Sequence, residues 1–477
     1  MIGARSPSKV GPGKPASCAV AVMTAAAVAL GSIPAQAQTG ANAGIPMIRD
    51  AEIEQLLRDY TKPIFKAAGL ETQNVHVVII DNPEFNAFVM DAHRIFVNSG
   101  ALMQSTTPNQ LIGVFAHECG HIVGGHLSKM RQELATVQTA MIIGMLLGAG
   151  ALAASATSGN VGMGNAGGAL LNAPQALGMS TILAYQRGQE ESADRAGVRF
   201  LTMTHQSAKG MYDTFKRFAD ESLFSAYDSN PYLQNHPAPE ERMAALEGLA
   251  KSSPYWNAKD PPELQFRHDM MRAKLYGFTK RPGEVQRRYP ATDTSLPARY
   301  ARAISTYRFG DLHSALAQID SLIQSMPNDP YFYELKGQAL LEGGHPAEAL
   351  APLRHAVAIA PTPALIQILL AQALVATNDP KLADEAIGVL HVALIAEPED
   401  GDAYTTLAMA YGRKNDLADA DLASAQAAFA RGDNKTAREL AARAKQRFPI
   451  GSPGWVRADD IVAFNANLKT NPLRIGQ

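Results

Sequence analysis

Apolar residues recur at intervals of three and four over residues 48–70, which predicts an amphipathic helix. A short β-branched run follows at residues 75–81, and residues 86–90 and 94–100 form two further strand-like runs separated by turn residues. These three runs predict a small antiparallel sheet beside a helix.

A second helix has a clear start signal. Thr107 can cap its N-terminus, Pro108 suits its first position, and Gln110 completes a capping box. The apolar pattern carries this helix to about Met130. Two later stretches also predict helices, one over residues 177–206 and one after His236-Pro237.

The C-terminal third of the chain repeats. A Gly, Ala, Pro pattern recurs after 34 residues, and the Ala-to-Pro spacing is 12 in every copy. The copies are Gly310, Ala315 and Pro327; Gly344, Ala349 and Pro361; Asp379, Ala386 and Pro398; and Ala437 and Pro449. This period is typical of tetratricopeptide helix pairs, so we expect an all-α solenoid over residues 297–465. A generic helical bundle with chance alanines is the competing interpretation.

The organisation that follows has four parts. Residues 1–37 resemble a secretory signal peptide, with a positive start, an apolar stretch and the cleavage pattern Ala35-Gln36-Ala37. A retained anchor helix is the alternative, but the apolar stretch is short for a membrane span. Residues 38–250 would form a mostly helical α+β domain, and the proline-rich residues 251–296 a connecting region with at least one helix.

Composition excludes some classes of protein. Hydrophobic residues make up 46% of the chain and charged residues 18%, which suits a globular protein with a core. The formal net charge is −2, so nothing indicates a general affinity for nucleic acid. Removal of Cys18 with the signal peptide would leave Cys119 as a single thiol.

The chemistry centres on His117-Glu118-Cys119-Gly120-His121, an HExxH motif inside the capped helix. Residues four apart lie about 40° apart around a helix, so both imidazoles can bind one ion. Zinc would lower the pKa of a bound water, and Glu118 would accept its proton before attack on a peptide carbonyl. Two helical histidines that bind nothing would be costly in so apolar a helix.

A third protein ligand is needed, and the spacing leaves alternatives open. His126 lies about 140° around the helix from His121 if the helix continues, so it would face elsewhere, either as a surface residue or as one that supports the site from outside the ligand set. Glu190 and Asp194 are four residues apart on the next predicted helix and can face one point. Glu190 could then bind the ion while Asp194 hydrogen-bonds a ligand imidazole. An ordinary solvated acidic patch would show the same spacing.

The combination of motifs resembles the HtpX/BepA/prenyl-protease class of zinc metallopeptidases. The resemblance rests on a strand containing Asn86-Ala87-Phe88, the HExxH motif, the ExxAD pattern that begins at Glu190, and the later His236-Pro237 and Arg242. With a signal peptide before and repeats after, the layout is most similar to the periplasmic β-barrel assembly-enhancing proteases of that class. Residues 91–94 depart from the class, because relatives commonly carry a Pro-Gly turn there.

The resemblance implies a set of roles. His117, His121 and Glu190 would hold one zinc ion per chain, and Asn86, Ala87 and Phe88 would lie near a substrate-binding edge strand. His236 would approach the metal and block its open position, with Arg242 near the site. Substrates would be unfolded or stalled outer-membrane proteins, and the repeats would contact the β-barrel assembly machinery.

Residues 134–186 contain no Asp, Glu, Lys or Arg. One interpretation is a lid or a membrane-contacting loop, with membrane contact through residues 140–156; the other is a true membrane span, for which the apolar core is short. Three functions therefore compete: a periplasmic zinc endopeptidase, a chaperone-like repeat adaptor with latent proteolysis, and a membrane-embedded protease. Two histidines and one carboxylate favour zinc over cobalt or manganese.

Overall fold

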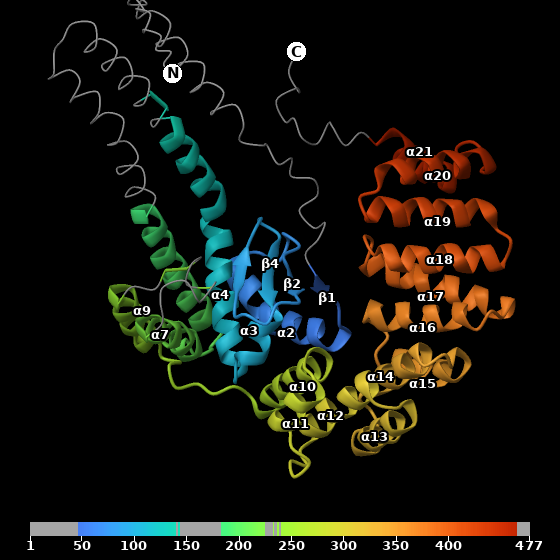
Figure 1. Cartoon of the computed structure of the whole chain (residues 1–477). Helices are drawn as coiled ribbons and strands as arrows, with labels where there is room; N and C mark the ends of the chain where they lie inside the picture. Colours follow the sequence, from blue (N-terminus) through green and yellow to red (C-terminus); the bar gives the residue numbers. More distant parts are fainter. Residues whose placement is uncertain are drawn as a thin grey trace, which may run out of the picture. The chain divides into compact units, whose positions relative to one another are not determined.

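The computed structural model describes residues 46–139, 142–143, 183–224, 232, 236–237 and 240–464 (Figure 1). The expected signal peptide and most of the expected lid, residues 144–182, lie outside these described residues. Among the helices of the described part, none combines the length and the apolar character that a membrane crossing requires.

The first helix, α2 (Ala51–Ala68), lies inside the predicted range 48–70. Asp50 caps it by accepting a hydrogen bond from the Ile53 backbone N at 2.9 Å, and Gly69 ends it in the left-handed conformation at φ 73°. Its apolar face is buried, which explains the three-and-four spacing of the sequence.

The sheet has four strands in the order β1-β2-β4-β3. Their bounds are β1 (Met47–Ile48), β2 (His76–Ile80), β3 (Ala87–Val89) and β4 (Arg94–Asn98). β1 and β3 pair antiparallel with their neighbours, but β2 and β4 are parallel. The expectation of a purely antiparallel sheet was therefore wrong. The expectation assumed that strands adjacent in sequence are also adjacent in the sheet. Instead, β4 lies between β2 and β3 and pairs with both.

Helix α4 (Pro108–Gly124) carries the HExxH motif and begins as predicted, with Thr107 at its cap and Pro108 at its first position. The side chain of Gln110 accepts from the Thr107 backbone N at 3.4 Å. The helix does not continue to Met130, because Gly125 adopts a left-handed conformation at φ 61° and a new helix covers residues 126–139.

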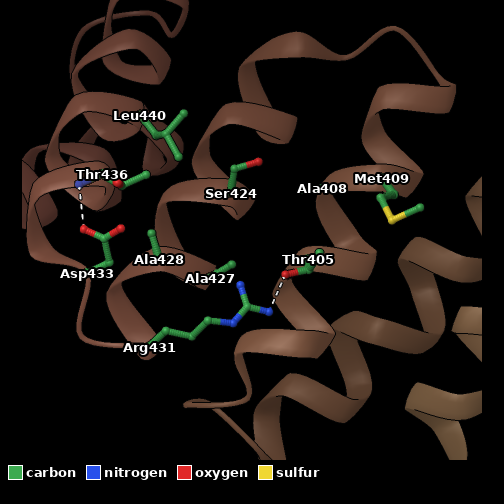
Figure 2. Close-up of a pocket in the computed structure, with 10 residues that line it drawn as sticks. All are labelled: Thr405, Ala408, Met409, Ser424, Ala427, Ala428, Arg431, Asp433, Thr436 and Leu440. Carbon is green, nitrogen blue, oxygen red and sulfur yellow. Dashed lines mark hydrogen bonds between the residues drawn. The ribbon is translucent and has the colours of Figure 1, made fainter. Parts of the chain in front are cut away.

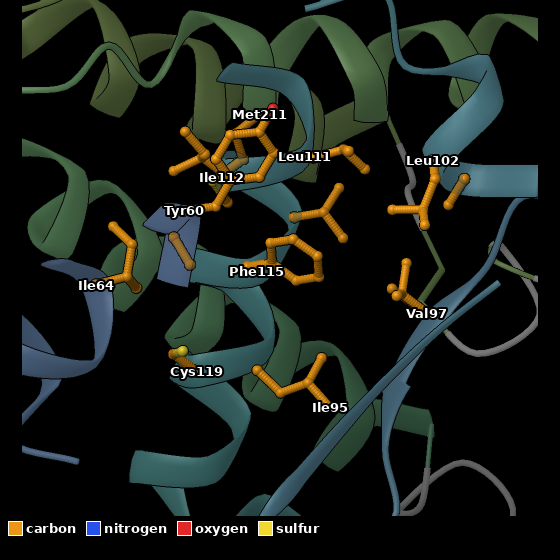
Figure 3. Packing of buried hydrophobic residues seen from close by; sticks show 14 of the residues in the cluster. Tyr60, Ile64, Ile95, Val97, Leu102, Leu111, Ile112, Phe115, Cys119 and Met211 are labelled. Atoms are coloured by element: carbon orange, nitrogen blue, oxygen red, sulfur yellow. The ribbon is translucent and has the colours of Figure 1, made fainter. Parts of the chain in front are cut away.

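Further helices surround α4. The second predicted helix is present over residues 183–203, and the third is α9 (Glu240–Ser252). The sequence did not predict the short α3 (Ser99–Gln104), α7 (Lys209–Phe224) or the strand β1. The core of this part contains α2, the sheet, α4 and α7, and Figure 3 shows Tyr60, Phe115, Ile95 and Met211 among its buried side chains.

An all-α solenoid of helix pairs forms the rest of the described chain, as the repeat pattern predicted (Figure 1). The repeat alanines Ala315, Ala349, Ala386 and Ala437 are all completely buried, so stacking explains their spacing. The helices are α12 (Leu296–Phe309), α13 (Leu312–Ser325), α14 (Pro330–Glu342), α15 (Pro346–Ile359), α16 (Ala364–Ala376), α17 (Ala383–Ala396), α18 (Gly401–Arg413), α19 (Leu417–Ala430), α20 (Asn434–Arg447) and α21 (Pro453–Ala463).

The connecting region contains α10 (Pro262–Thr279) and α11 (Pro282–Arg288). Buried polar contacts tie α10 to the first part of the chain. His268 lies between the Tyr60 hydroxyl, 3.0 Å away, and the Ser105 carbonyl, 2.9 Å away. Lys274 is buried and lies 2.8 Å from an oxygen of Asp50, so α10 holds the start of α2 through an ion pair.

The same lysine reaches the repeats. Its ammonium lies 3.1 Å from Glu52 and 3.8 Å from Glu334 on α14, and the Tyr300 hydroxyl of α12 donates to Glu52 at 2.9 Å. The junction between the first part of the chain and the repeats is therefore a buried polar cluster with one lysine and several carboxylates.

Farther along the repeats, a hollow of about 480 Å³ lies between α18, α19 and α20. Figure 2 shows the residues that line it. Arg431 crosses its rim and donates to the Thr405 hydroxyl at 2.8 Å. Apolar lining residues include Met409 and Leu440, so the hollow is an amphipathic surface rather than a charged one.

Candidate metal centre

Helix α4 presents His117, Glu118 and His121 to the interior, where all three side chains are buried. The helical spacing predicted that both imidazoles would face one point, and their Nε2 atoms lie 3.1 Å apart. Burial and the neighbouring His117 lower the pKa of His121. An uncharged imidazole offers the lone pair that a metal needs.

The helix over residues 183–203 approaches α4 unusually closely because small residues meet at the crossing. A Cβ atom on Gly120 would lie 2.8 Å from the Ala193 Cα, and one on Gly197 would lie 3.2 Å from the His117 backbone N. This contact brings the buried Glu190 and Asp194 to the two histidines. The solvated acidic patch is therefore excluded as a description of this pair.

Four side chains converge on one point: His117, His121, Glu190 and His236. Each offers a ligand atom, and these atoms all lie within 4.8 Å of one another. Glu190 oxygens lie 3.4 Å from Nε2 of each α4 histidine, and His236 Nδ1 lies 3.2 Å from Glu190 and 3.3 Å from His117 Nε2. Two or three imidazoles with one carboxylate form a donor set that suits a divalent metal such as zinc.

Arg242 supports the acidic side of the site. Its guanidinium makes a two-point contact with Asp194, at 2.7 and 2.9 Å, and lies 2.9 Å from Glu190. Burial alone would raise the pKa of Glu190, but His236, His117 and Arg242 outweigh it and hold that pKa well below its usual range. Burial opposes the charge of Asp194 as well, but Arg242 and His117 lower its pKa, so the surroundings favour the charged form of both carboxylates. Arg242 is itself buried against them.

Asp194 contacts the other ring nitrogen of a histidine. Its Oδ1 lies 3.0 Å from His117 Nδ1. Burial disfavours the charged imidazolium, yet Asp194 and Glu190 outweigh burial and raise the pKa of His117 to about 9. A carboxylate at Nδ1 fixes a ring so that Nε2 faces the ligand cluster.

Glu118 lies beside the cluster but outside its ligand set. Burial raises its pKa, and neither carboxylate oxygen has a hydrogen-bond partner among the described residues. The nearest base is His236, whose Nε2 lies 3.6 Å from Glu118 Oε1. A buried carboxylate without partners is costly, so its position fits a group that bonds to a water or substrate in the site.

Of the two positions that the sequence left open for His126, the structure excludes the surface one. Because Gly125 ends α4, the chain turns back and buries His126, whose Nδ1 lies 3.0 Å from His121 Nδ1. The available signal was the Gly124-Gly125 pair, which marks a helix end. Two aromatic neighbours were also not foreseen: Phe215 packs edge-on against His117, and Tyr232 stacks on His236.

The residues expected at a substrate strand lie at an edge of the sheet. Ala87 and Phe88 belong to β3, which pairs with β4 on one side and has no strand on its other side among the described residues. Asn86 comes just before it and accepts a backbone hydrogen bond from Asn98 at 2.9 Å. Phe88 stacks on Phe96 with ring centres 5.5 Å apart, which fixes the strand on the sheet.

Comparison with known proteins agrees with this geometry. Residues 48–250 match Peptidase family M48. A match to the crystal structure of a thermophilic TPR protein of Thermus thermophilus covers 36% of this chain and 100% of that chain, at 18% identity and a TM-score of 0.23.

Curated relatives cover both parts of the chain. A β-barrel assembly-enhancing protease of Yersinia pestis is 25% identical over 429 residues, or 87% of this chain and 84% of the relative. The protein of that name from Escherichia coli strain K12 is 23% identical over 424 residues, or 87% and 83% of the two chains. Residues 48–250 are therefore similar to peptidase family M48, and the chain is a metallopeptidase with helical repeats after those residues.

Proposed function

We propose that this chain is a zinc-dependent endopeptidase in which His117, His121 and Glu190 hold the metal and Glu118 is the catalytic base. The observation that carries the proposal is the convergence of the ligand atoms within 4.8 Å, beside a buried carboxylate that has no other partner among the described residues. When bound, the metal would polarise the scissile carbonyl and lower the pKa of water.

The chain's own groups divide the remaining work. Glu118 takes a proton from the attacking water and returns it to the leaving amine, a task for which a raised pKa is suited. Asp194 holds the His117 ring from behind, at 3.0 Å from its Nδ1. Against burial, Arg242 contributes most to lowering the pKa of Asp194. It also contacts Glu190, whose pKa His236 and His117 lower more strongly.

His236 is proposed to regulate access. A catalytic zinc site needs three protein ligands and one open position, whereas a site with four protein ligands is closed. His236 Nδ1 lies 3.3 Å from His117 Nε2 and its Nε2 3.6 Å from Glu118. It therefore occupies space that water and substrate need, and its departure would open the site.

The β3 edge of the sheet, which has no further strand beside it among the described residues, is the proposed substrate track. An extended peptide can add to β3 as a further strand, so that backbone hydrogen bonds hold it without regard to most of its sequence. Asn86, Ala87 and Phe88 would supply that edge. Recognition through the backbone suits unfolded proteins.

The proposed cellular role is quality control and assembly of outer-membrane proteins in the bacterial periplasm. Two observations support it: the signal-peptide pattern of residues 1–37, and relatives named β-barrel assembly-enhancing protease that match across both parts of the chain. Outer-membrane proteins that are unfolded or stalled would be the substrates. The repeats would present a surface to the assembly machinery.

Metal analysis tests the site. Purified mature protein should contain about one zinc per chain, and His117→Ala and Glu190→Ala should each lose it. Glu191→Ala is the matched control, because the Glu191 side chain is 51% exposed and pairs with Arg195 on the same helix. Zinc retained in Glu190→Ala would instead favour His236 as the third ligand, and no zinc in the wild type would overturn the proposal.

A second function is favoured by the closed arrangement around His236: a repeat adaptor whose proteolysis is latent. Glu118→Gln should abolish casein cleavage while it retains zinc. If adaptor function is separate, Glu118→Gln should still support outer-membrane protein assembly in cells, and deletion of residues 297–465 should not. Loss of assembly in Glu118→Gln would show that proteolysis is the essential activity.

A further inference from the structure

The two α4 histidines have different partners behind them. His117 Nδ1 faces a carboxylate, Asp194, at 3.0 Å. His121 Nδ1 faces a second imidazole, His126, at 3.0 Å between the two Nδ1 atoms. The rings of His121 and His126 meet edge to face, with centres 5.0 Å apart and planes at 82°.

The two ring nitrogens of His121 point in opposite directions. Its Nε2 lies 3.1 Å from His117 Nε2 and 3.4 Å from Glu190, so that nitrogen points into the ligand cluster. Its Nδ1 points the opposite way, to His126. His126 is therefore behind His121 and is not among the four converging ligand residues.

The local chain is built to make this contact. In a continuous helix, position 126 would lie about 140° from His121. Gly125, at φ 61°, ends the helix and turns the chain back. Gly124 leaves room for the ring, since a Cβ atom at that position would collide with the His126 imidazole.

The backbone of the returning residue is fixed as well. Gln189, the neighbour of Glu190, donates from its side chain to the His126 carbonyl at 3.1 Å in a buried contact. The helix that supplies Glu190 therefore also anchors His126. Two glycines and one buried hydrogen bond place a single imidazole against the back of His121.

We propose that His126 is a positioning residue that selects the tautomer of His121. The inference rests on the proposed metal site. His126 in its Nε2–H form accepts a hydrogen bond from His121 Nδ1–H, which leaves the lone pair of His121 on Nε2, where the metal binds. Without an acceptor at that position, His121 can carry its proton on Nε2, and that tautomer offers the metal no lone pair.

Zinc affinity of the full chain tests the proposal. Competition with a chromogenic zinc chelator would compare the wild type with His126→Asn and His126→Phe. Loss of a partner behind a ligand histidine typically weakens metal binding about 10- to 100-fold, which is the expectation for His126→Phe. His126→Asn keeps a hydrogen-bond acceptor near the position of Nδ1. Its zinc affinity should stay within about threefold of wild type, because the variant changes the geometry of one hydrogen bond without removing it.

Controls separate positioning from packing. His93→Phe changes an exposed histidine of the same domain and should bind zinc as the wild type does. Thermal unfolding in the presence of a chelator reports whether each variant is folded. Wild-type affinity in His126→Phe would overturn the proposal, as would equal loss in His126→Asn and His126→Phe.

The tautomer itself gives a second readout that needs no metal. Histidine-selective ¹⁵N NMR of the metal-free chain should show His121 protonated on Nδ1 in the wild type and in His126→Asn. In His126→Phe the signal should shift toward protonation on Nε2. If the wild type binds no zinc, the proposed function fails, and this spectrum still decides the tautomer; an unchanged His121 signal in His126→Phe would overturn the inference alone.

Discussion

Gly120 of α4 packs directly against the backbone of Ala193 in the helix over residues 183–203: a Cβ atom on Gly120 would lie 2.8 Å from the Ala193 Cα. Helices can approach this closely only where one of them lacks a side chain. The distance between the two helices sets the distance between His121 and Glu190. A glycine with no chemistry of its own therefore determines the geometry of the ligand cluster.

Gly120→Ala should disturb both folding and metal binding. The added methyl has no space, and overpacking of a buried contact costs about 1–3 kcal/mol of the free energy of unfolding. Because the helices must move apart, we also expect weaker zinc binding. Urea unfolding and chelator competition on the same preparation measure the two effects.

Gly188→Ala is the matched control, since Gly188 lies on the same crossing helix and a Cβ atom there meets nothing within 4 Å. It should be neutral or stabilise the chain by up to about 1 kcal/mol, because alanine favours a helix. If both substitutions behave alike, the close contact does not set the site geometry.

Local chemistry predicted the elements that carry the site. Each of these signals can be recognised within a single helix: the cap at Thr107 and the HExxH spacing in α4, and the four-residue spacing of Glu190 and Asp194 in the helix over residues 183–203. Long-range placement was harder to predict. The parallel pairing of β2 with β4 depends on which side of β4 the β3 strand joins, and no local pattern states that.

Two further features show why the remainder was missed. His126 was assigned to a continuing helix, although one left-handed residue, Gly125, reverses the chain. Lys274 comes from the proline-rich connecting region, where nothing marks it as buried. Its partners lie on α2 and α14, more than fifty residues away in each direction. Such a cluster exists only once the solenoid has folded beside the first part of the chain.

Arg242→Met should destabilise the metal-free chain strongly. Glu190 and Asp194 are buried, and removing the guanidinium takes away the positive charge that pairs with both carboxylates. This should lower the free energy of unfolding by about 3–5 kcal/mol. Zinc should recover part of this loss, because the metal supplies positive charge to Glu190. Denaturant unfolding with and without zinc measures both effects.

The control for that variant is Arg195→Met, whose guanidinium contacts Glu191 at 3.5 Å with both side chains more than half exposed. A surface ion pair of this kind contributes at most about 1 kcal/mol. An Arg242→Met chain no less stable than Arg195→Met would contradict the role given to Arg242.

Removal of the metal should lower the unfolding temperature of the wild type. A ligand that binds only the native state stabilises it by about 4 kcal/mol when its free concentration is 1,000 times the dissociation constant. Calorimetry with zinc or with excess chelator measures the difference. His121→Ala should unfold at the same temperature in both conditions; a chelator effect that persists in this variant would place the stabilising metal elsewhere.

The junction should lose stability as pH rises. Burial, with Asp50 and Asp329 nearby, raises the pKa of Glu52 to about 7 despite the opposing charge of Lys274. The unfolded carboxyl releases its proton near 4.5, so between about pH 4.5 and 7 the folded state binds more protons. Stability from this group is complete below that window and is lost as pH rises through it.

The same cluster is also faced by Glu334 and Tyr331 of α14, by Asp329 at the cap of that helix, by Tyr300 of α12 and by Asp50. Burial also raises the pKa of Glu334. Glu52→Gln imitates the protonated side chain at every pH. It should match the wild type near pH 5 and be more stable above pH 7, as measured by urea midpoints from pH 5 to 8.5. Glu439→Gln, at an exposed position of α20, should follow the wild type throughout. A Glu52→Gln chain that differs from wild type by a constant amount at every pH would show that Glu52 is already ionised in the folded chain.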